Sequence, residues 1–112
     1  MKTFTVRKKQ GIFVFPIDDI IYMEKNLRKI NIHTVDQQIE FYGRFADVVP
    51  LLDERFMYCH RSYVINMDKI VWMQKNYIYV SGNETIFFGH DSFSRAKKIF
   101  VKYLVGKQSL NH

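Results

Sequence analysis

The chain has 112 residues, which is enough for one domain and too few for two. It is 47% hydrophobic and 25% charged, as expected of a soluble globular protein, and its apolar runs fall far short of the roughly 20 residues that a membrane-spanning helix needs. The single cysteine, Cys59, excludes an internal disulfide, and no apolar stretch of signal-peptide length follows the basic Arg7-Lys8-Lys9, so we expect a cytoplasmic domain.

The net charge of +6 is concentrated in the second half of the chain. Residues 1–56 contain nine Lys or Arg against eight Asp or Glu, whereas residues 57–112 contain eight against three. Such an asymmetry favours an anionic partner. Many basic domains of this size bind no nucleic acid, so charge alone does not decide which partner it is.

The N-terminal part of the chain is predicted to form five strands. Aromatic or β-branched residues alternate with polar ones at 3–7 and 12–17, and further strand-forming runs follow at 20–24, 30–35 and 38–42. Pro16 argues that the second strand lies at an edge or ends there, because proline cannot donate a hydrogen bond to a neighbouring strand. The basic loop Lys25–Lys29 joins the third and fourth strands, and on its residues alone it is an ordinary solvated turn.

Residues 44–55 change to a helical period. The apolar residues that share one predicted helical face are Phe45, Val48, Val49 and Leu52. Pro50 conflicts with a continuous helix, because in mid-helix it removes a backbone hydrogen bond and clashes with the preceding turn, at a cost of about 3 kcal/mol or more. We therefore expect either a kinked helix or a second short turn that begins at Pro50.

The stretch from Phe56 to Ile70 contains two short predicted strands, at 56–59 and 63–65, with polar residues between and after them. The polar residues are His60, Arg61, Ser62 and Asn66. A buried polar group without a partner costs about 1–3 kcal/mol. At least part of this polar group is therefore expected to face water or a ligand.

Three more strands are predicted at 70–74, 77–80 and 85–88, separated by turns at 75–76 and 81–84. Their aromatic residues are dense, which is also typical of surfaces that stack the bases of single-stranded nucleic acid. However, Tyr77 and Tyr79 share one face of their strand while Ile78 and Val80 share the other, as in a packed sheet. We favour sheet packing over base stacking.

The last predicted element is an amphipathic helix that follows residues 89–92 and ends at Gly106. Its apolar stripe consists of Ala96, Ile99, Phe100, Tyr103 and Leu104. Asp91, Ser92 or Ser94 is expected to cap its first backbone N–H groups. We expect the domain to occupy residues 1–106 and residues 107–112 to form a flexible tail.

Basic residues line a neighbouring face of this helix: Arg95, Lys98 and Lys102. Arg95 is expected in the first turn, where the helix dipole disfavours a cation, and exposed N–H groups beside two cations would suit a phosphate. A solvated basic face explains the same residues equally well.

No catalytic or metal-binding motif is found in the sequence. The plausible soft or borderline ligands are His33, Cys59, His60 and His90, and no two have the close spacing of a zinc motif. No Gly-rich phosphate loop, nucleophile elbow or HExxH helix is present. His60 and Ser62 lack an orienting acid or an oxyanion hole, so we expect neither an enzyme nor a metal or cofactor.

The central stretch carries a family signature as well. His60-Arg61-Ser62-Tyr63-Val64-Ile65-Asn66, with Phe56 before it and Ile70 after it, resembles the motif of the LytTR DNA-binding domain of LytR/AgrA-type bacterial response regulators. Tyr58 departs from that motif, which often has a basic residue there. The runs 38–43 and 94–99 also look like the family, so the resemblance covers roughly residues 11–105.

This resemblance implies a mainly β fold of about eight to ten short antiparallel strands, with one mid-chain helix and one C-terminal helix. It also implies a sequence-specific transcription regulator that binds double-stranded DNA at promoters and reads the major groove with loops. The protein would be either the output domain of a response regulator in a two-component system or a stand-alone regulator. Tandem sites, a dimer on DNA and a receiver domain or regulatory partner outside this chain are further expectations of the resemblance.

The resemblance also implies residue roles. Base contacts are expected from Arg61, Arg28, Lys29 and Asn26. Phosphate contacts or support of the loop are expected from His60, Ser62, Asn66, Ser94, Arg95, Lys97 and Lys98. Arg61 is the expected main reader, because a guanidinium can bond both O6 and N7 of guanine. For Asn66 a DNA contact and a structural bond are both open, and we favour the second.

Two other classes of function remain open. The aromatic strands and the positive charge also suit a small β domain that binds RNA or single strands. The charge alone suits a protein-interaction module that docks an acidic partner.

Overall fold

The computed structural model describes residues 2–107, which form ten strands and two α-helices. The strands are β1 (Thr3–Lys8), β2 (Gly11–Pro16), β3 (Ile20–Asn26), β4 (Lys29–Thr34), β5 (Gln38–Tyr42), β6 (Phe56–His60), β7 (Tyr63–Asn66), β8 (Ile70–Gln74), β9 (Tyr77–Val80) and β10 (Glu84–Phe87). The helices are α1 (Phe45–Val48) and α2 (His90–Val105). The mainly β fold with one mid-chain and one C-terminal helix is confirmed.

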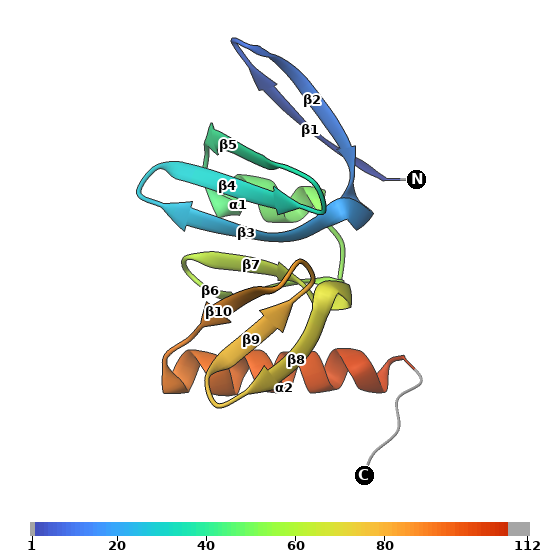
Figure 1. Cartoon of the computed structure of the whole chain (residues 1–112), viewed down its shortest axis with the longest axis vertical. Helices are drawn as coiled ribbons and strands as arrows, with labels where there is room; N and C mark the ends of the chain where they lie inside the picture. The colour runs from blue at the N-terminus through green and yellow to red at the C-terminus, as the bar shows by residue number, and fades with distance from the viewer. Residues whose placement is uncertain (1, 108–112) are drawn as a thin grey trace.

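The strands form three antiparallel sheets. β1 pairs with β2; β5, β4, β3, β7 and β6 form a five-stranded sheet in that order; β10, β9 and β8 form a three-stranded sheet. Figure 1 shows the three sheets stacked along the long axis, with α2 across the layer of β8, β9 and β10. The five-stranded sheet is therefore the middle layer of the molecule.

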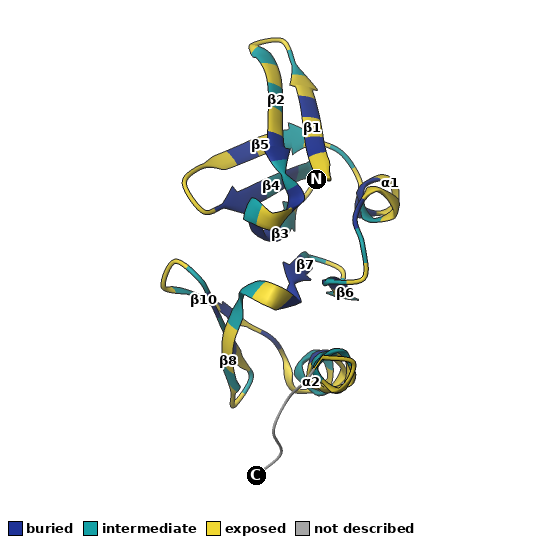
Figure 2. Cartoon of the chain, turned by 90° about the vertical axis from the view of Figure 1, so that its right-hand side faces the viewer, coloured by how far each residue is buried: buried dark blue, intermediate teal, exposed yellow. Residues whose placement is uncertain are grey.

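Two hydrophobic cores lie on opposite faces of the middle sheet. The first core joins this sheet to the β1–β2 hairpin and α1 and includes Ile30, Ile32 and Phe45. The second joins it to the three-stranded sheet and α2 and includes Ile65 and Ile78. Figure 2 shows these buried positions where the layers meet. Burying each large apolar side chain is worth about 1.5–3 kcal/mol, so the middle sheet is fixed from both sides.

A bulge in β3 changes which core its successive residues face. The register of β3 against β4 shifts between Ile20 and Tyr22. Ile20 and Met23 consequently face the first core, whereas Ile21 and Tyr22 face the second. An extra residue at a bulge breaks the alternation of side chains along a strand, which is why Ile21 and Tyr22 face the same core. The apolar run itself reflects the burial of both faces of β3.

The mid-chain helix is much shorter than predicted. α1 is a single turn, and a 3₁₀ turn at Val49–Leu51 follows it with Pro50 near its start. Of the two alternatives at Pro50, the second short turn is the correct one. Phe45, Val48 and Leu52 are buried as their spacing predicted, so the apolar face was right although the helix length was wrong.

The start of α2 also differs from the prediction. The helix begins at His90 after Gly89, and within the described residues no side chain caps it. Asp91, Ser92 and Ser94 lie inside the helix, so their predicted capping role is wrong. Arg95 is in the second turn, which removes the expected conflict with the dipole in the first turn. The helix ends at Val105, before Gly106 as predicted, and residues 108–112 of the expected tail lie outside the described residues.

Candidate nucleic-acid interface

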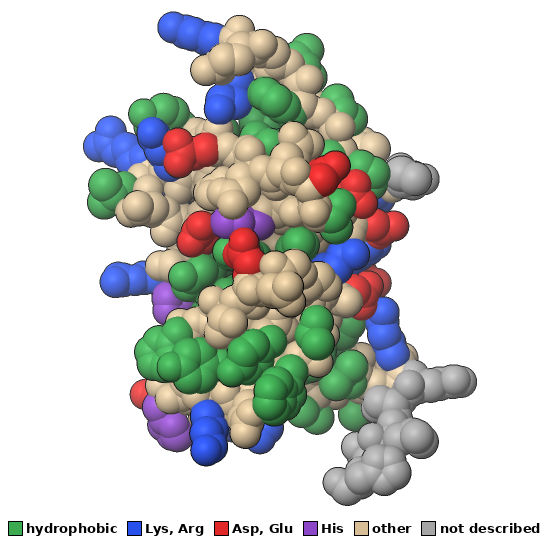
Figure 3. Space-filling model, in the orientation of Figure 1, with side chains coloured by type: hydrophobic (Ala, Val, Ile, Leu, Met, Phe, Trp, Pro, Cys, Tyr) green, Lys and Arg blue, Asp and Glu red, His purple; other side chains and the backbone are tan. Residues whose placement is uncertain are grey.

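Three elements end on the same side of the molecule, at the left of Figure 1. They are the turn between β3 and β4 with its flanking residues (26–29), the loop between β6 and β7 with its flanking residue (60–62), and residues 90–98 of α2, which we call the first half of the helix; together we call them the tip surface. Every predicted site residue except Asn66 lies on them: Asn26, Arg28 and Lys29 on the turn, His60, Arg61 and Ser62 on the loop, and Ser94, Arg95, Lys97 and Lys98 on α2. Figure 3 shows Lys and Arg side chains along this side at several levels.

The β3–β4 turn presents Arg28 to solvent. It is a two-residue turn in which Leu27 has a φ of 59°, and both Leu27 and Arg28 are exposed. Lys29 is less available, because its ammonium lies 3.3 Å from Glu40 Oε1 and 5.3 Å from the centre of the Tyr42 ring. The hydrogen bond to Glu40 raises the pKa of Lys29. Of the two cations, Arg28 is therefore the more available, because no ion pair among the described residues involves its guanidinium.

The β6–β7 loop is braced on both sides of Arg61. The Ser62 N–H donates to His60 Nδ1 at 3.0 Å, and the Ser62 carbonyl accepts from the Lys25 N–H at 2.8 Å. The second bond ties this loop to the end of β3, beside the turn that carries Arg28. The backbone around Arg61 is thereby fixed while its side chain stays exposed.

His60 connects this loop to the start of α2. Its ring stacks on Phe88 with centroids 4.8 Å apart. Burial lowers the pKa of His60, and the nearby positive charges of Arg61 and Arg95 lower this pKa further. Because Nδ1 accepts a hydrogen bond, the neutral ring carries its proton on Nε2. Arg61 and Arg95 thus lie close enough to one histidine for both to act on it, although they come from a loop and a helix.

Cys59 lies beneath the same junction. Burial raises the pKa of its thiol to about 11, against the opposing effect of the Arg95 charge. A thiol with such a pKa is almost wholly protonated at neutral pH. Cys59 therefore acts here as a small packing residue.

Asn66 is the one predicted site residue that the fold removes from the tip surface. Its side chain is 0% exposed, donates to the Ile20 carbonyl at 2.8 Å and accepts from the Asp68 N–H at 2.9 Å. These bonds join the end of β7 to the start of β3 and cap the 3₁₀ turn at Met67–Lys69. Both polar groups of the side chain are occupied inside the protein.

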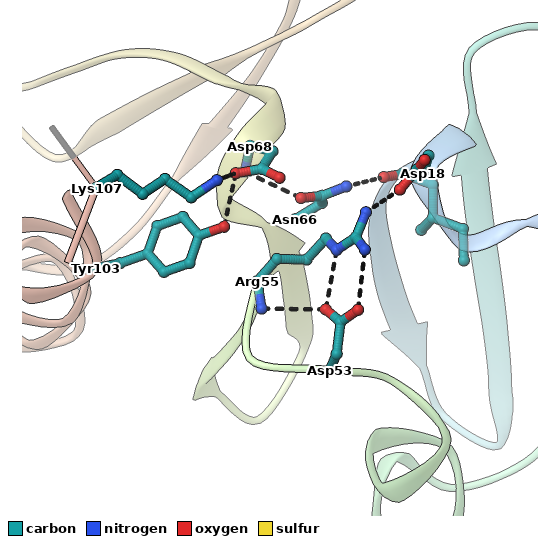
Figure 4. Close-up of polar contacts among 8 residues, drawn as sticks. Asp18, Asp53, Arg55, Asn66, Asp68, Tyr103 and Lys107 are labelled. Carbon is teal, nitrogen blue, oxygen red and sulfur yellow. Dashed lines mark hydrogen bonds and ion pairs between the residues drawn. The ribbon is translucent and has the colours of Figure 1, made fainter. Parts of the chain in front are cut away.

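A polar network connects the layers around Asn66, as Figure 4 shows. Arg55 donates to both carboxylate oxygens of Asp53, at 2.9 and 3.0 Å, and also to Asp18. These carboxylates raise the pKa of Arg55. Asp68 accepts from Tyr103 at 2.7 Å and from Lys107 at 2.8 Å, which ties the end of α2 to the turn before β8. Sequence reasoning missed this network, because its members are far apart along the chain and no local pattern pairs them.

A second polar cluster joins the middle sheet to β10. The buried His33 places Nε2 2.7 Å from Glu24 and stacks on Tyr22 with ring centroids 4.1 Å apart. The Tyr22 hydroxyl donates to Glu84 on β10 at 2.5 Å. Burial raises the pKa of Tyr22, and the hydrogen bond to Glu84 raises this pKa further. This cluster holds the hairpin that carries Arg28 against the three-stranded sheet.

The outer face of the three-stranded sheet is aromatic and exposed. Trp72 stacks on Tyr79 at 5.1 Å, and Tyr77 lies 5.2 Å from Phe87, measured between ring centroids. Trp72 is 56% and Phe87 58% exposed, whereas Ile78 is buried on the opposite face of the sheet. The predicted division of the two faces is confirmed. The aromatic face is the green area at the lower front of Figure 3.

Residues 2–107 hold no group of three or more His, Cys, Asp or Glu side chains placed to bind a metal ion. Neither helix among these residues has the length and apolar character needed to cross a membrane. What the tip surface offers instead is a row of exposed guanidinium and ammonium groups on a braced backbone. Such groups bond phosphates and base edges without any further cofactor.

Comparison with known proteins shows the family to which this chain is similar. A family model described as the LytTr DNA-binding domain matches residues 10–100. Accessory gene regulator protein A of Staphylococcus epidermidis is 35% identical over 90 residues, which cover 74% of this chain and 37% of that protein. The protein of the same name from Staphylococcus aureus strain N315 is 31% identical over 72 residues, or 62% of this chain and 30% of that protein.

The fold is matched by a solved structure as well. A LytTr DNA-binding domain from Bacillus cereus superimposes with a TM-score of 0.76, covering 88% of this chain and 96% of that one, at 17% sequence identity. The similarity therefore extends over nearly the whole of that domain. By contrast, the chain spans little more than a third of the first Staphylococcus relative, 37% of its length.

Proposed function

This chain belongs to the family of LytTr DNA-binding domains, and on that premise we propose that it binds double-stranded DNA in a sequence-specific way and regulates transcription. The tip surface is the part that contacts the DNA. Its loops and the first half of α2 approach the duplex together, and no recognition helix enters a groove lengthwise.

One observation carries this proposal: the elements that bear the exposed Arg28, Arg61 and Arg95, namely the β3–β4 turn, the β6–β7 loop and α2, end on one side of the stack of sheets. The backbone at Arg28 is fixed by strand pairing, the backbone at Arg61 by the braced loop, and the backbone at Arg95 by the helix. Because the backbone is already fixed, only the side-chain rotamers remain to be ordered on binding, so more of the interaction energy appears as affinity.

Arg61 has the position of a base reader. It is exposed at the middle of the three elements, and the loop that carries it is closed by His60 and Ser62. A guanidinium that bonds O6 and N7 of guanine in the major groove discriminates between bases by about 1–3 kcal/mol. Arg28, with Asn26 and Lys29 beside it, reads a second segment of groove from the β3–β4 turn.

The first half of α2 holds phosphates in this arrangement. Arg95, Lys97 and Lys98 are exposed, and Ser94 is half-buried beside them. Contacts of this kind fix the register of a protein on the duplex and act on every sequence alike. His60 and Ser62 support Arg61, and Asn66 joins the end of β7 to the start of β3 from inside the fold.

A larger regulatory assembly is part of this proposal. Since this chain spans only about a third of their length, we propose that it acts with a receiver domain or another regulatory partner and works in the cytoplasm. Binding as a dimer to repeated promoter sites belongs to the same proposal.

A selection from randomised duplex DNA at near-physiological salt tests the function. The duplexes that the protein retains are collected and sequenced, and their sequences show whether a motif is enriched. Enrichment of a short repeated motif would support sequence-specific regulation. Retention without enrichment would reduce the tip surface to a general phosphate-binding surface, and no retention would contradict the proposal.

The exposed aromatic face supports a second candidate function, the binding of single-stranded nucleic acid. Trp72 and Tyr79 already stack on each other and are partly open to solvent, and base stacking on such rings is worth about 1–3 kcal/mol per base. Trp72 is the only tryptophan of the chain, so its fluorescence reports on this face alone. Quenching by single-stranded oligonucleotides but not by duplexes would favour this function over the first.

A further inference from the structure

A groove separates the β1–β2 hairpin from β5 and α1. Its volume is about 830 Å³, within the range of sites that hold ligands. Phe4, Val6 and Phe41 supply its apolar floor, and the exposed Tyr42 and Leu51 stand at its border. The groove lies at the opposite end of the molecule from the aromatic face (Figure 1), and Lys29 is the one described residue that it shares with the predicted site residues of the tip surface.

Unpaired strand edges face this groove from both sides. β5 is the last strand of its sheet, and the Lys8 ammonium donates to the Glu40 carbonyl at 2.5 Å, so that carbonyl points away from β4. In an antiparallel pair, alternate residues direct their backbone groups outward, which places those of Tyr42 outward as well. The same alternation in the β1–β2 hairpin turns the backbone groups of Thr5 and Arg7 away from β2.

Such edges are templates for another strand. The bond from Lys8 to Glu40 is exposed to solvent, so an incoming chain can displace it at little cost.

The charges around the groove have one dominant sign. Five Lys or Arg line it against two carboxylates: Arg7, Lys8, Lys9, Lys29 and Arg44 against Glu40 and Asp47. Lys29 pairs with Glu40 and Arg44 with Asp47. Arg7 and Lys9 of the β1–β2 hairpin therefore remain available for negative charges from outside, and Lys8 becomes available when its bond to Glu40 is displaced.

We propose that this groove binds an extended acidic segment of a separate protein, which adds to the edge of β5 as a further strand. Apolar side chains on one face of that segment would reach the floor at Phe4 and Phe41. Its carboxylates would pair with Arg7, Lys8 and Lys9. The free backbone edges and the apolar floor favour a peptide over DNA, because a phosphate backbone uses neither of them.

A peptide selection tests this proposal on the full chain. The probe is a displayed library of short peptides in which apolar positions alternate with positions randomised over Glu, Lys and Ser. We expect enrichment of Glu over Lys at the randomised positions. In ¹⁵N-labelled protein, the selected peptide should shift the amide signals of Thr5, Arg7, Glu40 and Tyr42.

Two controls separate strand addition from simple charge attraction. The selected peptide with N-methyl groups on alternate residues keeps its charge but cannot pair as a strand, and we expect its affinity to fall at least about tenfold. The double variant Arg7→Glu/Lys9→Glu should weaken binding by a similar factor. The double variant Lys75→Glu/Lys102→Glu has the same net charge, changes residues far from the groove and should bind within about twofold of the unchanged protein.

Three results would overturn the proposal. They are the absence of any enriched acidic peptide, unchanged affinity of the N-methylated peptide, and shifts confined to another face such as the aromatic one. If duplex DNA shifts the groove amides while no peptide does, the groove is an extension of the DNA-binding surface. Because selection on peptides and selection on duplexes are separate experiments, failure of this proposal leaves the proposed DNA-binding function untouched.

Discussion

Arg61 is exposed although the residues on either side of it are fixed. The Ser62 N–H bonds to the His60 ring and the Ser62 carbonyl bonds to β3, so the loop cannot move without breaking these contacts. A reader of base edges benefits from this preorganisation, because the backbone that carries the guanidinium is already ordered in the folded protein. The roles we assign at the residue scale therefore depend on the loop as much as on Arg61 itself.

Replacing Arg61 by alanine is expected to lower the preference for the selected DNA sequence over random duplex. If the guanidinium makes a bidentate base contact, the loss corresponds to about 1–3 kcal/mol of discrimination, and affinity for random duplex falls much less. Arg61→Lys is the matched control: it keeps the charge but cannot form the two-bond contact, so it should lose discrimination while retaining nonspecific affinity. An unchanged ratio of specific to random affinity in Arg61→Ala would exclude Arg61 as the base reader.

His60 makes the stability of the loop depend on pH. Burial first, and then the charges of Arg61 and Arg95, hold its folded pKa below the ordinary value of 6.5. The unfolded chain therefore binds this proton more readily, and the contribution of His60 is complete above pH 6.5 and is lost as the pH falls toward the folded pKa. Protonation at Nδ1 would also break the bond from the Ser62 N–H.

Urea unfolding at a series of pH values between about 7.5 and 5 measures this effect. The free energy of unfolding should fall with pH more steeply in the unchanged protein than in His60→Asn, whose side-chain oxygen can still accept from Ser62. The difference between the two proteins isolates His60 from the other histidines. Parallel pH profiles would show that the loop does not sense this proton.

At the scale of the elements, Asn66 connects strands that would otherwise be held together only by their backbone hydrogen bonds. It bonds the Ile20 carbonyl at the start of β3 and the Asp68 N–H in the turn before β8. Asn66→Ala leaves both groups without this partner in a fully buried place. Each such group costs about 1–3 kcal/mol, and we expect the free energy of unfolding to fall by several kcal/mol in total.

The comparison of Asn66→Ala with Asn66→Asp refines this expectation. Aspartate keeps the acceptor for Asp68 but loses the donor to Ile20, so both variants should be destabilised through the bond to Ile20. Measured at a temperature where both variants are folded, the preference for specific over random DNA should remain unchanged. A loss of sequence preference in the folded variants would assign Asn66 a DNA contact after all.

The strands were predictable because their signal is local. Alternating aromatic and β-branched residues, with turns such as 75–76 and 81–84, mark all ten strands to within a few residues. The two helices show where local signals compete. Pro50 cut α1 short despite a good apolar period, and α2 began at His90 although better capping residues followed it.

The candidate site likewise has residues that the sequence could predict and contacts that it could not. Polar residues between two apolar strands, as in His60-Arg61-Ser62, have to reach the surface, so the sequence could single them out. The bonds of Arg55 to Asp18 and of Asp68 to Tyr103 join distant parts of the chain and leave no periodic trace. The groove beside β5 depends on how two sheets sit on each other, which no local pattern encodes.

At the scale of the whole molecule, the stack of sheets separates three surfaces. The tip surface lies at the ends of strands and of α2, the aromatic face lies on the outside of the three-stranded sheet, and the basic groove lies beside the β1–β2 hairpin (Figures 1 and 3). A duplex on the first surface, as proposed, would leave the aromatic face free and would meet the groove only at Lys29. The overall positive charge favours approach to DNA from a distance, whereas under this proposal the tip surface decides the final orientation.

The separation of general attraction from local contact can be measured through the salt dependence of binding. Each phosphate that a protein neutralises releases counterions and contributes about 0.9 to the slope of log affinity against log salt concentration. Lys98 is exposed on the first half of α2, so Lys98→Ala should reduce this slope by about that amount and weaken specific and random duplexes alike.

Lys102→Ala is the matched control, one turn further along α2 and beside Glu54 and Asp68. It removes the same charge from the molecule, so equal changes in both variants would mean that only net charge matters. An unchanged slope in Lys98→Ala would remove Lys98 from the phosphate contacts, whereas a change confined to Lys98 would place the first half of α2 against the DNA backbone.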